Sequence, residues 1–329
     1  MEALLRVKNL SIGIYRGKQL YSSVEDLSFD IYPGEIVGIV GESGSGKSLT
    51  ALSVPGLLGE GKAVTRGTIL FSGEKGVPLR DLLTLSEKEL EAVRGKEISM
   101  IFQEPFSSLN PLLKAGKQIA ETLELHGEKG KKLVKPRMKE LLSKLKFPEP
   151  EKIMEAYPLR LSGGMCQRVM IALAVICRPR LLIADEPTTA LDQDTQTQIL
   201  SLLKEINSDF GTSILFISHD LALVRNLCSR VLVIYSGRIL EGGDTEEVFS
   251  HPAHEYTKGL LGSIPSRANR GKNLASISGK IPSLEEGRPQ GCPFHPRCEK
   301  AGPACKGEFP PERNIDTNHK THCVLYGEN

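Results

Sequence analysis

A glycine-rich turn directly behind an apolar strand is the feature that most limits what this chain can fold into. The run EIVGIVG (35–41) predicts a short buried strand, and GESGSGKS (41–48) followed by LTALSV predicts a tight turn that opens a helix. Backbone N–H groups of such a turn curl around phosphates, its lysine reaches the β- and γ-phosphates, and its serine hydroxyl binds Mg²⁺. The residues predicted to hold the nucleotide here are Gly41, Ser43, Gly44, Gly46, Lys47, Ser48 and Leu49, with Ser48 also a Mg²⁺ ligand.

Further apolar runs predict the sheet that this turn belongs to. They are ISMIFQ (98–103), LLIAD (181–185), SILFIS (213–218) and VLVIYS (231–236). Their hydrophobicity is continuous, which is typical of parallel strands covered on both faces. Between them, the spacing of Ile199, Leu202, Leu203 and Ile206 predicts an amphipathic helix over about 193–209 that stops at Gly211. Strands alternating with helices indicate an α/β fold.

Three other segments break this pattern. LLRVKNLSIGI (4–14) and VEDLSFDI (24–31) alternate apolar and polar residues, which predicts an antiparallel sheet with one solvated face. The stretch of about 105–161 carries amphipathic helix patterns around 116–125 and 136–146 and no convincing strand, so we interpret it as a helical insertion. After Ile264 the chain turns polar and glycine-rich up to Gly291, which predicts a linker.

Composition excludes several classes of protein. Hydrophobic residues make up 40% and charged residues 25% of the 329 residues, so the chain is expected to be globular rather than disordered. The net charge of +2 does not favour nucleic acid as a partner. The longest uncharged apolar run, 169–177, is far shorter than the ~20 residues that span a bilayer, and no signal-type apolar core opens the chain. We expect a soluble, cytoplasmic protein.

Two carboxylates follow the strand 181–185. Asp185 and Glu186 fall at its carboxyl end, where open α/β sheets bind their ligands. Asp185 is predicted to hold Mg²⁺, directly or through water. Glu186 is predicted to act as general base on the attacking water.

A second glycine-containing turn opens a helix at LSGGMCQR (161–168). Ser162 is its expected N-cap, and Gly163 and Gly164 form the first turn, so this helix start is also shaped for an anion. One chain needs no second phosphate site beside the first. The turn is therefore expected to serve a nucleotide held by another subunit.

Together these motifs resemble the nucleotide-binding subunit of an ATP-binding cassette (ABC) transporter over about residues 1–255. In the family's order they are the Walker A loop at 41–48, the Q-loop at Gln103, the signature at 161–168, the Walker B strand with Asp185 and Glu186, the D-loop ending at Asp192, and the switch His219. The resemblance implies a P-loop NTPase fold: a RecA-like core, an antiparallel β subdomain, a helical subdomain inserted at about 105–165, and a small C-terminal extension at 256–329.

The same resemblance implies roles for individual residues. Gln103 is expected to contact Mg²⁺ or water, and His219 the γ-phosphate, so that both join Glu186 as catalytic residues. Asp192 is expected to bind at the nucleotide site. Tyr15 is the candidate for stacking on adenine, with Tyr21 as the alternative.

Cysteine is unevenly distributed, because four of the seven fall in the last 38 residues: Cys292, Cys298, Cys305 and Cys323. This end of the chain resembles the C-terminal extension of ATPases of the dipeptide, oligopeptide and nickel transporters, some of which hold a [4Fe-4S] cluster. The C-x5-C-x6-C-x17-C spacing supplies the four thiolates that such a cluster requires. Zinc is the competing metal, although it typically uses shorter gaps. His295 and His322 are alternative ligands, and free or disulfide-bonded cysteines are a third possibility.

The resemblance predicts an ATPase that powers a di- or oligopeptide importer from the cytoplasmic face of the membrane. Its partners would be two permease subunits, a second ATPase subunit, different or identical, and an extracytoplasmic substrate-binding protein, with no nucleic acid. Import of oligosaccharide or nickel by the same machinery is an alternative. A soluble ABC ATPase with no transport role and a purely binding or regulatory module are others.

Overall fold

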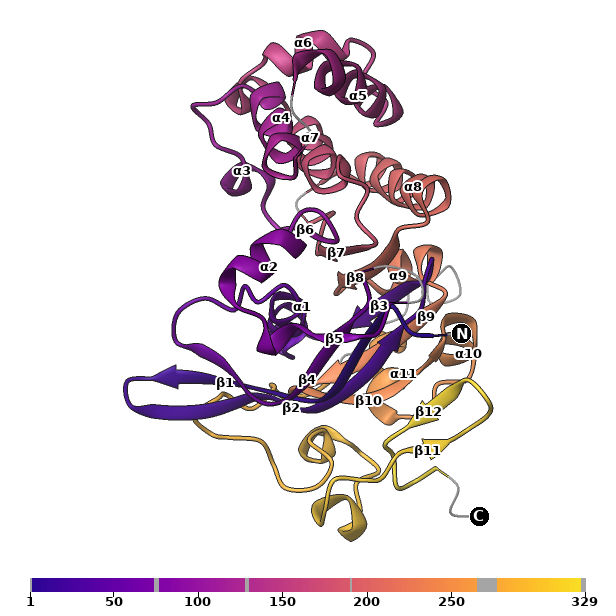
Figure 1. Cartoon of the computed structure of the whole chain (residues 1–329). Coiled ribbons are helices and arrows are strands. Elements are labelled where there is room, and N and C mark those ends of the chain that lie inside the picture. The colour runs from indigo at the N-terminus through magenta and orange to yellow at the C-terminus, as the bar shows by residue number, and fades with distance from the viewer. Residues whose placement is uncertain (1, 74–76, 128–129, 190, 265–276, 327–329) are drawn as a thin grey trace.

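Two β-sheets with helices around them make up the computed structural model, which describes residues 2–73, 77–127, 130–189, 191–264 and 277–326. Figure 1 shows a lobe of helices, α3 to α6, at one end of the molecule and the C-terminal extension at the other, with the sheets between them. The α/β prediction is confirmed.

The larger sheet carries the predicted parallel strands in the order β9-β3-β8-β7-β6. Their bounds are Arg230–Tyr235, Ile36–Val40, Ser213–Ser218, Leu181–Asp185 and Ile98–Ile101. All residues of β3, β7 and β8 are buried, as continuous hydrophobicity predicts for strands covered on both faces. Three antiparallel strands extend this sheet beyond β9, namely β10 (Arg238–Asp244), β12 (His319–Thr321) and β11 (Arg313–Asn314).

The smaller sheet is antiparallel, as the alternating N-terminal pattern predicts. Its order is β2-β1-β4-β5, with bounds Gln19–Ile31, Leu5–Arg16, Lys62–Phe71 and Arg80–Asp81. Leu5, Leu10 and Ile12 on β1 share one buried cluster with Val37 and Ile39 of β3. Apolar burial of this kind stabilises by ~25 cal/mol per Å². The smaller sheet is therefore fixed against the strand that leads into the phosphate-binding turn.

Helices cover the larger sheet and form the insertion. They are α1 (Lys47–Ser53), α2 (Glu87–Val93), α3 (Pro105–Ser108), α4 (Ala115–Leu125), α5 (Lys131–Lys144), α6 (Pro150–Glu155), α7 (Gly163–Val175), α8 (Gln193–Phe210), α9 (Leu221–Leu227), α10 (Thr245–Ser250) and α11 (Glu255–Gly262). Between 105 and 161 the described residues contain helices and no strand, which agrees with the predicted insertion. The helix predicted from Pro136 starts earlier, with Pro136 inside α5.

The amphipathic helix expected at 193–209 is α8, and its ends follow the sequence closely. Asp192 caps its start by accepting from the Thr195 backbone N–H, and Gly211 ends it with a left-handed φ of 65°. Glycine adopts this conformation without the steric penalty that other residues meet. No helix among the described residues combines the length and the apolar character that crossing a bilayer requires.

The described part of the C-terminal extension packs against the body of the protein. β12 pairs with β10 in the larger sheet, and His319 Nε2 lies 2.7 Å from a carboxylate oxygen of Glu241, both side chains being buried. The segment predicted as a linker is only partly within the described residues, because 265–276 lie outside them. Its later part, 277–291, contacts the body. The linker prediction is wrong for these residues, because Arg288 within them binds the carbonyls of Ser236 and Ser23, which lie far away in sequence.

Candidate active site

The phosphate-binding turn joins the end of β3 to the start of α1. Gly41, Gly44 and Gly46 have φ values of 154°, 78° and 100°. A Cβ atom at Gly41 would lie 2.1 Å from the carbonyl oxygen of Ile234, so only glycine fits there. Lys47 crosses the turn, where its Nζ donates hydrogen bonds to the carbonyls of Gly41 and Glu42 at 2.8 and 2.9 Å. Burial lowers the pKa of this lysine.

The carboxyl end of β7 meets the turn. Ser48 Oγ donates a hydrogen bond of 3.1 Å to Asp185 Oδ1, and the Asp185 side chain is buried. Burial raises the pKa of Asp185, and the hydrogen bond from Ser48 opposes this effect. Hydroxyl and carboxylate oxygens are ligands that Mg²⁺ prefers. The chemistry of this pair therefore fits the predicted magnesium site.

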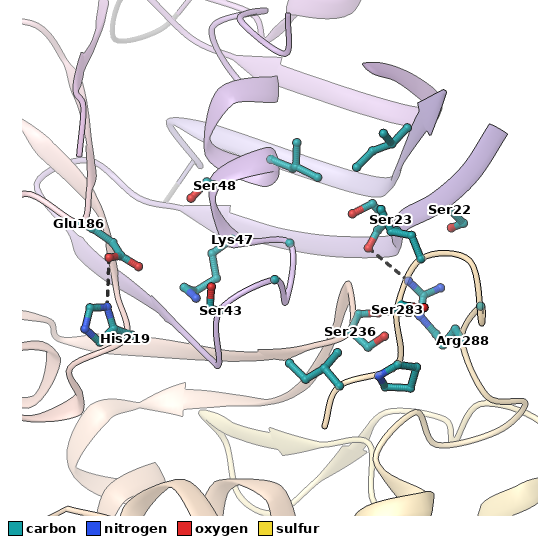
Figure 2. A pocket seen from close by; sticks show the side chains of 18 of the residues that line it. Ser22, Ser23, Ser43, Lys47, Ser48, Glu186, His219, Ser236, Ser283 and Arg288 are labelled. Carbon is teal, nitrogen blue, oxygen red and sulfur yellow. Dashed lines mark hydrogen bonds and ion pairs between the residues drawn. The ribbon is translucent and has the colours of Figure 1, made fainter. Parts of the chain in front are cut away.

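Glu186 is the centre of a small polar network. Its Oε2 accepts hydrogen bonds from Thr189 Oγ1 at 3.0 Å and from Gln103 Nε2 at 3.4 Å, and lies 3.0 Å from His219 Nδ1. Figure 2 shows Glu186 and His219 paired at one end of a cavity, with Ser43, Lys47 and Ser48 farther in. A carboxylate beside an imidazole can accept a proton from water and hold the water in place.

Sheet order explains why these residues meet. Gln103 follows β6, Asp185 and Glu186 lie at the end of β7, and His219 follows β8. The neighbours β3-β8-β7-β6 are parallel, so their carboxyl ends share one edge. The four predicted motifs are distant in sequence and are brought to one place by this order.

The cavity at this edge has a volume of about 780 Å³. Nine of the predicted residues line it: Ser43, Gly44, Gly46, Lys47, Ser48, Leu49, Gln103, Glu186 and His219. Gly41 lies at the base of the turn, and Asp185 reaches the cavity through Ser48.

Tyr15, the candidate for adenine stacking, does not line the cavity, and neither does Tyr21. Ile14 does so in their place. Adjacent side chains on a strand point to opposite faces, so with Ile14 facing the cavity the side chain of Tyr15 faces away, and it is half-exposed. Tyr21 lies on β2 directly opposite Ile14, yet Ile14 is the one of the pair that lines the cavity. Because Tyr15 and Ile14 are adjacent on β1, the sequence alone does not show which of the two faces the ligand.

The second predicted turn also lies away from this cavity. Ser162 caps α7 by accepting from the Met165 backbone N–H at 3.3 Å. A Cβ at Gly164 would lie 2.8 Å from the Thr195 methyl group, and Asp192 holds that threonine through its hydroxyl at 2.7 Å. Ser162, Gly163, Gly164 and Asp192 therefore gather beside the start of α8. Ala190, which belongs to the same motif as Asp192, lies outside the described residues.

Sequence reasoning missed one wall of the cavity. Residues of the C-terminal extension line it, together with Thr189, Ser22, Ser23 and Ser236. Those from the extension are Ile281, Pro282, Ser283, Leu284, Gly287 and Arg288. Their run is polar and glycine-rich, like a linker, and carries no motif that could have pointed to a ligand.

The four C-terminal cysteines line a second, small cavity of about 10 Å³, together with His254, His295 and His322. The Sγ of Cys292 lies 3.6 Å from His254 Nε2, and burial raises the pKa of Cys292 to about 12. Among the described residues, no three His, Cys, Asp or Glu side chains are arranged to hold a metal ion. The predicted [4Fe-4S] cluster and its zinc alternative are therefore not supported. The spacing does bring the four thiols to one cavity.

Two family profiles match the chain. One is described as ABC transporter and matches residues 24–189. The other is described as the C-terminal region of oligopeptide/dipeptide transporters and matches residues 240–305.

Curated proteins are similar over almost the whole chain. An oligopeptide transport ATP-binding protein of Haemophilus influenzae is 45% identical over 306 residues, which is 93% of this chain and 92% of the relative. A dipeptide transport ATP-binding protein of Bacillus subtilis is 43% identical over 326 residues, 99% of this chain and 95% of the relative.

Solved structures share the fold of about three quarters of the chain. One is a dimeric ATP-binding cassette in a post-hydrolysis state with ADP and Pi, which is 28% identical with a TM-score of 0.64, covering 73% of this chain and 98% of the other. A second, from Clostridium perfringens and part of an ABC transporter complex, is 25% identical with a TM-score of 0.64, covering 76% and 92%.

Proposed function

The chain belongs to the ABC transporter family of ATPases, and from that premise we propose that it is the ATP-hydrolysing subunit of a di- or oligopeptide importer. The observation that carries this proposal is the gathering of Lys47, Ser48, Glu186 and His219 around one cavity. The transported substrate is proposed from the relatives, which are named for oligopeptide or dipeptide transport. Oligosaccharide or nickel import and a role outside transport have no comparable support.

In this proposal the turn at 41–48 binds the phosphates of ATP. Lys47 contacts the β- and γ-phosphates, and Ser48 and Asp185 hold Mg²⁺, which neutralises phosphate charge when bound. Glu186 accepts a proton from the attacking water. His219 and Gln103 keep the carboxylate and the water in position, which their contacts with Glu186 support.

The turn at Ser162–Gly164 and Asp192 completes the site of a second ATPase subunit. None of these residues lines this chain's own cavity, and a phosphate-shaped turn outside its own subunit's site can serve a nucleotide held by a partner. Two subunits would face each other with ATP between them and separate after hydrolysis. The partner is a different ATPase or an identical copy.

Two permease subunits and an extracytoplasmic substrate-binding protein complete the assembly, which places this chain on the cytoplasmic face of the membrane. Apolar side chains exposed on and beside the helical insertion support a permease contact. They are Phe106, Leu112, Tyr157 and Leu159, with exposures of 53%, 81%, 40% and 77%. Large apolar side chains left in water in one part of the molecule can take part in an interaction surface.

We divide the chain into an ATPase domain at 1–255, with the helical subdomain at 105–165, and an extension at 256–329. Cys292, Cys298, Cys305 and Cys323 of the extension hold a [4Fe-4S] cluster in this proposal, or zinc. This metal-site proposal is supported by the fact that the four thiols line one cavity. The positions of the described side chains relative to one another do not add support. Iron, sulfide and zinc analysis of anaerobically purified protein tests it. Zinc without iron would decide for the alternative, and neither metal would refute both.

Glu186→Gln tests the ATPase assignment in the assembled transporter. The amide keeps the shape of the side chain but cannot act as base, so we expect ATP to bind while hydrolysis falls by ~10²-fold or more. Glu91→Gln is the matched control, because Glu91 is exposed on α2 and lies outside the cavity. A normal hydrolysis rate in the Glu186 variant would refute its role as base.

A further inference from the structure

The C-terminal extension forms part of the wall of the active-site cavity. Six of the twenty residues that line this cavity lie between Ile281 and Arg288, more than 90 positions after the last strand-end carboxylate, Glu186. A ligand that fills the cavity must therefore touch the extension. None of the predicted nucleotide-binding motifs includes these residues.

The position of this wall shows which part of a nucleotide would meet it. Figure 2 places Glu186 and His219 at one end of the cavity, Lys47 and Ser48 in the middle, and Ser283 and Arg288 at the opposite end. The acid that activates water must lie next to the γ-phosphate, and the turn binds the phosphates. The base and ribose must then lie toward residues 281–288.

The chemistry of this end suits a planar apolar face. Ile281, Pro282 and Leu284 flank Ser283 there, and Ile14 lies beside Ser22 in the pairing of β1 with β2. Among the described residues, those that line the whole cavity include no Phe, Tyr or Trp. Aliphatic side chains can cover the two faces of a base by apolar burial, as aromatic rings can by stacking. The hydroxyl groups of Ser22, Ser23, Ser236 and Ser283 lie at the same end and can bind polar edges.

Arg288 fixes this wall to the rest of the protein. Its Nε donates to the carbonyl of Ser236 at 2.6 Å and a terminal nitrogen donates to the carbonyl of Ser23 at 3.3 Å, while its guanidinium pairs with Glu25. The side chain is 10% exposed. Ile281 also packs on the main apolar core. A wall held in this way is ordered before the ligand arrives, which lowers the entropy cost of binding.

We propose that Ile281, Pro282 and Leu284 of the extension, together with Ile14, form the base-binding end of the nucleotide site, and that Arg288 is the positioning residue of this wall. The inference rests on the proposed ATPase function and adds to it. The extension is then a determinant of ATP affinity, whatever its cysteines bind.

Comparing two ligands tests this inference with the full-length chain. Mg²⁺-ATP carries base and phosphates, and Mg²⁺-tripolyphosphate carries phosphates alone. Ile281→Ser should weaken ATP binding about tenfold, as expected for lost apolar contact in a pocket, and leave tripolyphosphate binding unchanged. Ile14→Ala, on β1, should show the same selective loss. Lys47→Ala should weaken both ligands.

Ile277→Ser is the matched control. Ile277 precedes Ile281 by four positions and is likewise partly buried against the main core, but it does not line the cavity. We expect the Ile277→Ser variant to bind ATP and tripolyphosphate with the same affinities as the unchanged chain. Equal losses for ATP and tripolyphosphate in Ile281→Ser, or no loss for ATP, would overturn the inference alone. An unchanged chain that binds neither ligand would refute the proposed function as well.

Photolabelling gives a second readout that does not depend on a variant folding. An azido group on the base of ATP should attach to the peptide that contains 281–288, and excess ATP should prevent this. Labelling confined to the strand that carries Tyr15, with none in the extension, would overturn the inference.

Discussion

The ion pair between Arg297 and Glu42 joins the cysteine-rich extension to the phosphate-binding turn, and removing it tests that connection most sharply. Arg297 precedes Cys298, and its two terminal nitrogens donate to the two carboxylate oxygens of Glu42 at 2.6 and 3.0 Å. Its Nε donates to the carbonyl of Ser278 at 2.8 Å. The side chain of Arg297 is 6% exposed and that of Glu42 29%.

These exposures set the size of the effect. Removing one partner of a buried ion pair costs ~3–5 kcal/mol, because the other charge stays buried without its partner. Glu42 keeps some contact with water, so we expect Arg297→Met to lower the free energy of unfolding by about 3 kcal/mol, at the low end of that range. In a chain that already carries Arg297→Met, Glu42→Gln should lower the free energy of unfolding only slightly further. The coupling energy between the two changes should then be about 2 kcal/mol.

Urea unfolding of the four full-length proteins, followed by far-ultraviolet circular dichroism, measures this coupling. ATP binding to the same proteins should weaken with the single changes, because Glu42 lies inside the turn. Arg225→Met with Glu246→Gln is the control, since that pair is 52% and 69% exposed and should show no measurable coupling. Additive effects of the Arg297 and Glu42 changes, within about 0.5 kcal/mol, would refute the reasoning.

Three further predictions follow from single positions. Gly67→Ala should lower the free energy of unfolding by ~2–4 kcal/mol, because its φ is 105° and a Cβ would lie 2.6 Å from a carbonyl oxygen of β1. Gly211→Ala, at φ 65° with open space around it, should cost only about 1 kcal/mol, and urea unfolding compares the two. Burial raises the pKa of Tyr256 above its usual value of 10.0, so the stability it contributes is complete below that pH and is lost above it. Tyr256→Phe should therefore reduce the fall of unfolding free energy with pH above pH ~10 by up to about 1.4 kcal/mol per pH unit in urea titrations, and an unchanged slope would contradict this. Ser48→Ala should raise the Mg²⁺ concentration needed for half-maximal ATP hydrolysis, and chelating Mg²⁺ should stop hydrolysis in the unchanged chain.

Much of the fold could be predicted because its signals are local. Continuous apolar runs predicted β7 and β8 with their bounds, and the end of α8 followed from Gly211, whose left-handed backbone conformation favours glycine. The start of α5 was missed, since the amphipathic pattern was recognised only from Pro136 and the helix begins at Lys131. Each of these strand and helix bounds is determined by residues that are close to one another in sequence, within a single helix or strand.

The active-site residues could be predicted where one rule of sheet topology relates the ends of strands to a position in space. Glu186, Gln103 and His219 each follow a strand, and parallel strands share the edge where their carboxyl ends lie, so three local assignments were enough to bring them together. No such rule fixes which face of an antiparallel strand meets a ligand, and the choice of Tyr15 over Ile14 depended on that face.

The extension's contribution could not be predicted for a different reason. The contact between Arg288 and Ser23 joins positions 265 apart, and that between Arg297 and Glu42 joins positions 255 apart. An arginine in a polar, glycine-rich run is typical of a solvated linker, and the partners of Arg288 are two backbone carbonyls and the carboxylate of Glu25, which no motif marks. Such contacts depend on where the folded sheet places its turns in space, and this placement arises only when the whole chain has folded. A nucleotide site can therefore be recognised from its motifs while the wall that completes it is visible only in the structure.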